Sequence, residues 1–427
     1  MNKKITAAIL PMLLCILYNS ALSQNCTYQW NAQNSGIANQ LTVVKAVNGL
    51  ICWTGGANSV VRRTTDGGVN WQNGNPNPVV IAGMVNCIDA IDGNTAWLST
   101  TNSGSTFIYK TTNAGVNWQQ VFSSAQTRIF GLKMTDASNG FAFGDPISNI
   151  WQMLVTTNGG VNWQLSPNAP AAGSIETCLP NSFQVSLPNI WWGTSVTTVY
   201  RSTNSGGSFT SHAANVTGIY ILALHFGSDG TGFSASTSIS KSTNSGLNYS
   251  TLPAPGSGNI EAIQGEGQNF WFIRGNQIYR STDSGTSWEL VFTSAQSLVH
   301  MDFPDAVSGC QTGWAVGNGG YIYKMTGHIV GTSLNQNEIP AAFELKQNYP
   351  NPFNPETTIE FSIPISSVVE LRVFDNNGSE VSVLENRELT AGRYTYNFNT
   401  VHLASGVYFY TLKTPEFTQT RKMLLVK

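Results

Sequence analysis

Charge is scarce in this sequence. Of its 427 residues, 10% are charged, whereas about 25% is typical of soluble domains. The 21 Lys and Arg are balanced by 23 Asp and Glu, so there is no excess of basic residues to contact nucleic-acid phosphates. The composition therefore argues against a nucleic-acid partner.

Motifs of common enzyme classes are also missing. The strings GxSxG, HExxH and GxxxxGK do not occur, and the five His residues are scattered along the chain. These strings would mark an esterase nucleophile, a zinc protease and a phosphate-binding loop. We therefore expect no catalytic residues of these types, no cofactor and no metal site.

Cysteine is sparse and widely spaced. The Cys residues beyond the N-terminal segment include no CxxC pair and no neighbouring His, so a zinc site is not expected. Their odd number leaves at least one thiol without a partner in the chain, and Cys is also a common small core residue. The disulfide pairing stays open among Cys26, Cys52, Cys87, Cys178 and Cys310.

Residues 1–23 have the features of a secretory signal peptide. Lys3 and Lys4 precede an apolar run over residues 5–18, and Ala21 and Ser23 suit a cleavage site. The run is shorter than the roughly 20 apolar residues of a membrane-spanning helix. We expect Sec-type export to the periplasm and a mature chain without a transmembrane segment.

The sequence is rich in apolar and aromatic residues, which make up 41% and 11% of it and include 12 Trp. Such a chain can bury a large core, which argues against intrinsic disorder. Its 41 Gly and 17 Pro favour strands joined by tight turns. The predicted fold class is all-β.

A short string recurs six times at intervals of 39 to 47 residues. This period is typical of a propeller with one four-stranded blade per repeat. The copies are TTDGGVNW from Thr64, TTNAGVNW from Thr111, TTNGGVNW from Thr156, STNSGGSF from Ser202, STNSGLNY from Ser242 and STDSGTSW from Ser281.

Each copy, called the box below, has the composition of a hairpin between two strands. The Asp or Asn at its third position can accept hydrogen bonds from turn amides, and the Gly at its fifth position allows a positive φ angle. We expect the closing aromatic residue to pack between neighbouring units. A basic residue precedes five of the six boxes, and such regular placement indicates a structural role.

A seventh unit lacks its last strand. Residues 313–325 follow the pattern of earlier units, but no box comes after them. Thr27–Asn31 resembles the strand that follows the first box, Val69–Asn73, and can supply the missing outer strand. The prediction is a seven-bladed propeller over residues 24–327, closed through the chain ends.

The boxes resemble BNR, or Asp-box, repeats. Upstream of the boxes, an acidic turn residue is followed by Gly and an aromatic strand, as at Asp136 before GFAFGD. Together with these strands, the boxes resemble the propeller of the photosystem II assembly and stability factor family over residues 27–326. The resemblance implies the fold but selects no function, because Asp-box propellers include sialidases, xyloglucanases, sortilin-like receptors and non-enzymatic assembly factors.

Charged residues become more frequent after residue 327. Residues 328–342 are polar and aperiodic, as expected of a linker. Residues 343–427 begin with the proline-rich run NYPNPFNP from Asn348 and continue as short alternating strands with a turn at Asn376–Gly378. This pattern predicts a small immunoglobulin-like β-sandwich.

Residues 343–427 resemble the type A C-terminal sorting domain of the type IX secretion system of Bacteroidetes. The resemblance implies that an outer-membrane translocon recognises this domain and that the mature protein is secreted or kept on the outer cell surface. It rests on NYPNPFNP, Val373–Asp375 with Gly378, Gly392 with Tyr394, Leu403–Tyr408 and Lys422–Met423.

Glycosidase chemistry has little support in the sequence. Sialidases use three arginines, but only Arg128 and Arg274 of the propeller lie away from the boxes. Another glycoside hydrolase would need two carboxylates about 5 to 10 Å apart. The sequence does not position the available ones, which are Asp89, Asp145, Glu176, Glu261 and Asp302.

We expect a non-enzymatic propeller that works in binding or adhesion outside the cell, with an unknown extracellular glycan or protein as its ligand. Alternatives are a polysaccharide-active glycoside hydrolase and an assembly factor for other envelope proteins. The candidate ligand contacts, chosen because they do not repeat from unit to unit, are Arg128, Asp145, Trp191 and Arg274.

Overall fold

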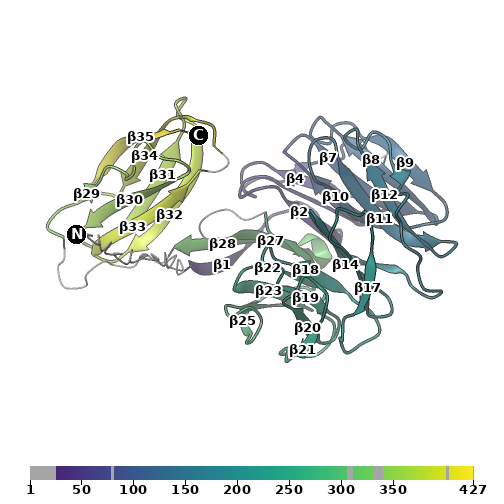
Figure 1. Cartoon of the computed structure of the whole chain (residues 1–427). Coiled ribbons are helices and arrows are strands. Elements are labelled where there is room, and N and C mark those ends of the chain that lie inside the picture. The colour runs from purple at the N-terminus through teal and green to yellow at the C-terminus, as the bar shows by residue number, and fades with distance from the viewer. Residues whose placement is uncertain (1–25, 78–80, 305–310, 330–339, 401–402, 427) are drawn as a thin grey trace, which may run out of the picture.

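The computed structural model describes residues 26–77, 81–304, 311–329, 340–400 and 403–426. Within these ranges, strands β1 to β28 form seven four-stranded sheets, and β29 to β35 form two more (Figure 1). The predictions of an all-β fold and of a propeller followed by a small sandwich are confirmed. The expected signal peptide and residues 330–339 of the expected linker lie outside the described residues.

Each of the first six blades is one sheet of consecutive strands, ordered from the inside outwards. Blade 1 contains β2 (Leu41–Ala46), β3 (Cys52–Gly56), β4 (Val61–Thr64) and β5 (Gln72–Asn73). Blade 2 contains β6 (Met84–Ala90), β7 (Ala96–Asn102), β8 (Ser105–Thr111) and β9 (Gln119–Ser124). Blade 3 contains β10 (Ile129–Met134), β11 (Gly140–Ile147), β12 (Ile150–Thr156) and β13 (Gln164–Leu165).

Blades 4 to 6 repeat this order. Blade 4 contains β14 (Cys178–Ser186), β15 (Asn189–Thr194), β16 (Thr198–Ser202) and β17 (Thr210–Ala213). Blade 5 contains β18 (Ala223–Phe226), β19 (Gly232–Ala235), β20 (Ile239–Ser242) and β21 (Ser250–Leu252). Blade 6 contains β22 (Ala262–Glu266), β23 (Asn269–Arg274), β24 (Gln277–Ser281) and β25 (Glu289–Thr293).

Blade 7 is built from both ends of the propeller segment, as the sequence predicts. It contains β26 (Leu298–Asp302), β27 (Thr312–Gly317), β28 (Ile322–Ile329) and, as its outer strand, β1 (Cys26–Gln33). β1 and β28 pair antiparallel from Cys26 opposite Ile329 to Gln33 opposite Ile322. Short 3-10 turns lie at Ala57–Ser59 in blade 1 and Asn318–Gly320 in blade 7.

The boxes form the turns between the third and fourth strands of blades 1 to 6. In the first box, the hydroxyl of Thr64 donates to Asp66 Oδ1 (2.8 Å) and accepts from Gly68 N (2.9 Å), while Asn70 N donates to Asp66 Oδ1 (3.0 Å). The same three contacts recur in the other five boxes. They use one side-chain oxygen, so Asn can replace Asp.

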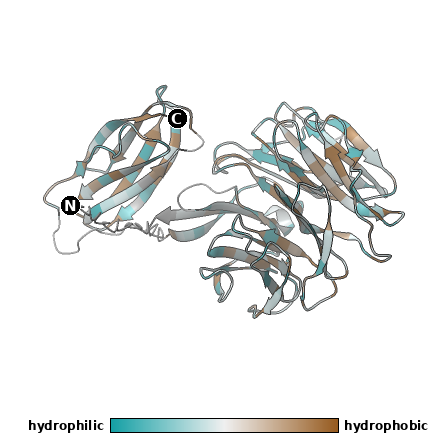
Figure 2. Ribbon diagram, in the orientation of Figure 1, coloured by the Kyte–Doolittle hydropathy of each residue, from teal (hydrophilic) through white to brown (hydrophobic). Residues whose placement is uncertain are grey.

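The core lies between the blades. In Figure 2 the hydrophobic colour is mainly on the strands. Trp118, which closes the second box, packs edge-on against Trp53 of blade 1 at 6.2 Å between ring centroids and donates to Gly74 O at 2.8 Å. Trp118 therefore packs between neighbouring units as expected, and Phe143 of blade 3 likewise contacts Trp192 of blade 4 at 4.6 Å between ring centroids.

The C-terminal sandwich has two sheets. One contains β29 (Glu344–Leu345), β30 (Glu356–Ile363) and β33 (Gly392–Asn399); the other contains β31 (Ser367–Phe374), β32 (Glu380–Leu389), β34 (Gly406–Lys413) and β35 (Thr418–Leu425). Their facing side chains form one hydrophobic core. The carboxylate of Glu385 is buried there and accepts a hydrogen bond from Tyr396 Oη at 2.6 Å.

The four cysteines in the described part of the chain are of two kinds. Cys26 is disulfide-bonded, whereas Cys52, Cys87 and Cys178 are free and buried. The partner of Cys26 therefore lies outside the described residues. Burial raises the pKa of all three free thiols, that of Cys87 to about 12.

The thiols give a first prediction. In the folded protein, Cys52, Cys87 and Cys178 should resist iodoacetamide, because each is buried and its thiolate is disfavoured. In denaturant without reductant all three should be alkylated, whereas Cys26 should react only after reduction. Peptide mass mapping measures both, and alkylation of any of the three in the folded protein would contradict the prediction.

Closure of the ring gives a second prediction. Trp30 of β1 is 7% exposed and packs against Phe292 of blade 6 and Phe303 of blade 7. Trp30→Ala should lower the free energy of unfolding by about 3–5 kcal/mol, measured by urea denaturation. The exposed neighbour Asn31 is the matched control, and Asn31→Ala should change it by less than about 0.5 kcal/mol. Equal effects would mean that β1 does not hold the ring closed.

Candidate functional site

Polar side chains line the central channel of the propeller, and seven of them occupy the same register position, one in each blade. These seven residues, called the channel ring below, surround a cavity of about 180 Å³. Each is opposite an aromatic residue of the second strand of its own blade. In blade order they are Lys45, Asp89, Lys133, Gln184, His225, Gln264 and Asp302.

The inner strands have open edges that face the channel. Several ring side chains form hydrogen bonds with backbone groups on these edges. The last backbone N–H of β10, at Met134, donates to Asp89 Oδ2 at 2.6 Å, and that of β2, at Ala46, donates to Asp302 Oδ2 at 2.8 Å. The amide of Gln184 donates to Phe226 O and accepts from Phe226 N. A backbone N–H or C=O that is buried at a strand edge without a partner is costly. Since each partner here belongs to the neighbouring blade, these contacts also hold adjacent blades together.

Charge is confined to one arc of the ring, in blades 7, 1, 2 and 3. Lys45 Nζ lies 3.1 Å from Asp302 Oδ2. Burial raises the pKa of Asp89, while the positive charges of Lys133 and Lys45 act in the opposite direction. The other arc, from Gln184 to Gln264, carries amides and one imidazole. Two basic and two acidic side chains therefore leave the channel with little net charge.

A bulge in β14 crosses the channel. Residues 179–182 are inserted between the pairs Cys178–Thr194 and Phe183–Trp192. Asn181, with φ of 62°, uses its side-chain N–H groups to donate to Glu261 O (2.8 Å) and Val299 O (2.9 Å). Blade 4 is thereby joined to blades 6 and 7, and Asn181 itself lines the cavity.

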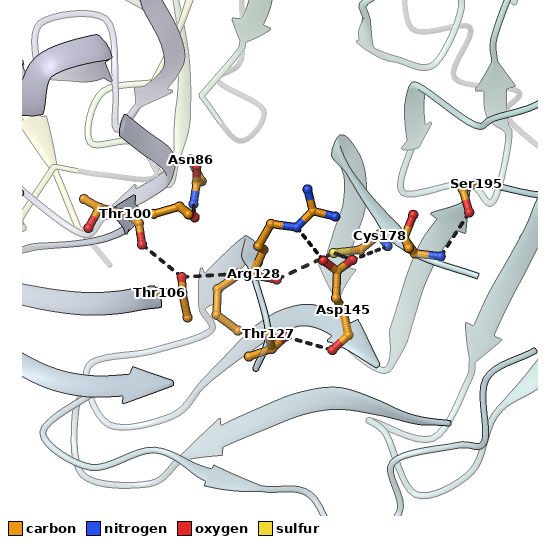
Figure 3. Close-up of polar contacts among 11 residues, drawn as sticks. Asn86, Thr100, Thr106, Thr127, Arg128, Asp145, Cys178 and Ser195 are labelled. Atoms are coloured by element: carbon orange, nitrogen blue, oxygen red, sulfur yellow. Dashed lines mark hydrogen bonds and ion pairs between the residues drawn. The ribbon is translucent and has the colours of Figure 1, made fainter. Parts of the chain in front are cut away.

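Arg128 and Asp145 are the two predicted contacts that the structure brings together. Arg128 Nε lies 2.7 Å from Asp145 Oδ2, and Asp145 Oδ1 accepts a hydrogen bond from Cys178 N at 3.0 Å (Figure 3). The Arg128 side chain is 50% exposed, and its guanidinium lies 5.4 Å from the ring centroid of Phe130, which lines the channel. Arg128 therefore remains available to a ligand.

Trp191 is not a non-repeating residue, so the prediction that it is a ligand contact is wrong. It is the blade 4 member of the set opposite the channel ring, equivalent to Trp97 in blade 2. It is 1% exposed, stacks on Phe226 and donates to Ser245 O at 2.7 Å. Its burial leaves no surface for a ligand, so Trp191 is part of the core.

Arg274 also has a structural role and lies apart from the ring. It is 4% exposed, and its guanidinium donates to Thr237 O of blade 5 at 2.8 Å and to Pro255 O. Burial lowers the pKa of its guanidinium. The interior position of Arg274 does not support its predicted role as a ligand contact.

Four of the five candidate carboxylates for hydrolysis are engaged in structural contacts, whereas burial raises the pKa of the fifth, Glu261. Asp89 and Asp302 belong to the channel ring, where Lys45 of blade 1 stands between them. Glu176 is buried and accepts from Tyr200 Oη at 2.7 Å and Gly173 N at 2.8 Å. Among the described residues, no group of three or more His, Cys, Asp or Glu side chains could hold a metal ion.

Most of the channel ring was not identified from the sequence, although a signal was present. Asp89, Lys133 and Asp302 each stand three residues before an Asp. These following residues are Asp92, Asp136 and Asp305. Lys45 stands three residues before Asn48, which has the equivalent turn position. The position of the Asn181 bulge has no comparable repeat.

Solved structures similar to this chain are propellers. YCF48 from Cyanidioschyzon merolae has a TM-score of 0.55 at 16% identity, with 69% of this chain and 98% of that chain covered. The structure described as YCF48 bound to D1 peptide has a TM-score of 0.54 at 16% identity, covering 70% and 96%. The WD40 propeller domain of Doa1 has a TM-score of 0.51 at 11% identity, covering 70% and 97%. These likenesses show the fold, and no curated protein matches the chain.

The C-terminal sandwich has a sequence-level match. Residues 347–427 match the secretion system C-terminal sorting domain family. The sorting domain indicates export to the cell surface or secretion, and it implies an interaction with the secretion machinery. No helix in the described part of the chain is long and apolar enough to cross a membrane.

The proline-rich run that opens the sorting domain is held by two anchors. Asn348 is 2% exposed, and its side chain donates to Thr357 Oγ1 (2.8 Å) and Pro350 O (3.1 Å). Phe353 is 3% exposed, and its backbone exchanges hydrogen bonds with Leu424 O and Val426 N, each at 3.0 Å. The run is thereby fixed to the last strand of the domain.

His300, which lines the channel beside the ring, gives a third prediction. Its Nδ1 accepts from Val44 N at 3.3 Å, and burial lowers its pKa to about 4. Because the unfolded pKa is about 6.5, the unfolded chain binds this proton more readily, so stability should fall as pH drops from about 6.5 to 4, by up to about 3 kcal/mol.

His300→Asn provides the control, because it keeps an acceptor for Val44 N without titrating. Urea denaturation across this pH range should show a smaller loss of stability in the variant. Asp89, whose pKa is raised, contributes to both proteins and cancels in the difference. Identical pH profiles would contradict the assignment of the acid sensitivity to His300.

Proposed function

We propose that this chain is an exported, non-enzymatic binding protein. In this proposal the propeller holds an extracellular ligand, and the sorting domain directs passage through the type IX translocon of the outer membrane after transit through the periplasm. The observation that carries it is the presence, in one chain, of a closed seven-bladed ring and a C-terminal segment that matches the sorting-domain family.

The state of the carboxylates supports a non-enzymatic role. General acid–base hydrolysis needs one carboxyl group free to protonate a leaving group and a second free to attack or activate water. Asp302 is paired with Lys45, Asp89 accepts the Met134 amide, and Glu176 accepts the Tyr200 hydroxyl. Each of these three carboxylates is therefore engaged in a structural contact within the propeller.

Arg128 beside the channel supports ligand binding. One guanidinium edge is occupied by Asp145, but half of the side chain is exposed next to Phe130. An exposed Arg beside an aromatic ring suits the carboxylate of a peptide or of an acidic sugar. The propeller described as bound to D1 peptide has the same fold, which favours a protein ligand and keeps an envelope assembly factor as the second candidate.

Ligand binding is tested with the mature full-length chain on glycan and peptide arrays. We expect saturable binding to one class, weakened roughly tenfold by Arg128→Ala, because a charge-assisted contact would be lost. Arg62→Ala, in β4 beside the first box, is the matched control and should bind normally. Hydrolysis of any glycan that is abolished by Asp89→Asn or Asp302→Asn would overturn the non-enzymatic proposal.

Export is tested by cell fractionation of a chain that ends before Phe343. Removal of the sorting domain should leave the propeller in the periplasm, because the part recognised by the translocon is missing. Unchanged delivery to the surface or the medium would overturn the proposed export route.

A further inference from the structure

The run that opens the sorting domain contains both buried and exposed residues. Asn348 and Phe353 anchor it, as described above, whereas Tyr349 between them is 81% exposed. The backbone of Tyr349 is nevertheless fixed, because it exchanges two hydrogen bonds of 2.9 Å with Thr358. The tyrosine ring is therefore held outwards by an ordered backbone and contributes little buried area to the fold.

Other exposed apolar residues lie in the same run and on the strand that the run contacts. Pro350 and Pro352 are exposed. Asn351 Oδ1 accepts a hydrogen bond from Leu424 N at 2.9 Å, which places the end of β35 beside the run. Leu424 is 37% exposed and Val426 is 48% exposed. The name tyrosine–proline surface is used below for Tyr349, Pro350, Pro352, Leu424 and Val426.

This surface has the properties of a docking site. Aromatic residues contribute strongly to protein interfaces when they enter a pocket of the partner. A side chain presented on a fixed backbone costs less entropy to bind than one on a mobile loop. The surface also joins the two ends of the matched segment, residues 347–427, so it would be complete only in a fully folded sorting domain.

We propose that the tyrosine–proline surface is where the outer-membrane translocon docks the sorting domain. The partner is a translocon protein with an apolar pocket that accepts the Tyr349 ring and an acidic group near the exposed Lys422, whose backbone O accepts from Gln347 Nε2 at 2.7 Å. This inference rests on the proposed export function and adds to it the contact surface.

Secretion of full-length variants tests the inference. Tyr349→Ser should reduce delivery to the surface or medium by about tenfold and leave folded protein in the periplasm. Because the ring is exposed, the melting temperature should stay within about 2 °C. Tyr349→Phe keeps the ring and should be exported. Val368→Ser is the matched control, since Val368 is 51% exposed on β31 of the same domain.

The outcomes separate this inference from the export proposal. If the chain truncated before Phe343 is retained but Tyr349→Ser is exported normally, docking at this surface is wrong and the export proposal stands. If the truncated chain is itself exported, both fail. A Tyr349→Ser variant that melts much earlier than the original chain would give Tyr349 a folding role and also overturn the inference.

A photo-crosslinking amino acid at position 349 identifies the occupant directly. A covalent adduct with an outer-membrane protein in secreting cells would support the inference. An adduct with the propeller of the same chain, or with a second copy of it, would overturn it.

Discussion

The pairing of β1 with β28 is the interaction on which the rest of the propeller depends. Without it, blade 7 would end at an exposed β28 edge, and Trp30 would not cover Phe292 and Phe303. Propeller blades are stabilised by the faces they present to their neighbours, so an incomplete blade weakens the packing on both sides of it. The closed ring in turn brings seven inner strands around one channel and sets the positions of the channel-ring side chains.

The channel shows how a repeated scaffold can carry non-repeated chemistry. The residue opposite each ring position is always aromatic and belongs to the core, as Trp97 and Trp191 do. The ring position itself varies among Lys, Asp, Gln and His. Variation at one register position therefore changes the electrostatics of the channel without changing how the blades pack, and the alternating charges of blades 7 to 3 compensate one another.

Much of the fold could be predicted because its determinants are local and periodic. The box encodes a turn through one hydroxyl, one side-chain oxygen and one Gly, so six copies reveal six blades. The outer strand at Thr27–Asn31 could be found because it resembles the strand after the first box. The channel contacts were harder to predict, because they depend on which side chain faces the neighbouring blade. Trp191 appears unique in the sequence, yet its strand register makes it equivalent to Trp97. The contacts of Arg274 with blade 5 and of Asn181 with blades 6 and 7 link distant segments, which no local pattern specifies.

Closure through the chain ends also imposes an order in time. During synthesis β1 is made first, yet its partner, β28, lies about 290 residues later and is followed closely by the sorting domain. Pairs this distant in sequence form late in folding. The ring can therefore be completed only when the chain is available as far as β28, shortly before the sorting domain itself can fold. Completion of the propeller and folding of the sorting domain therefore depend on the same late stretch of the chain.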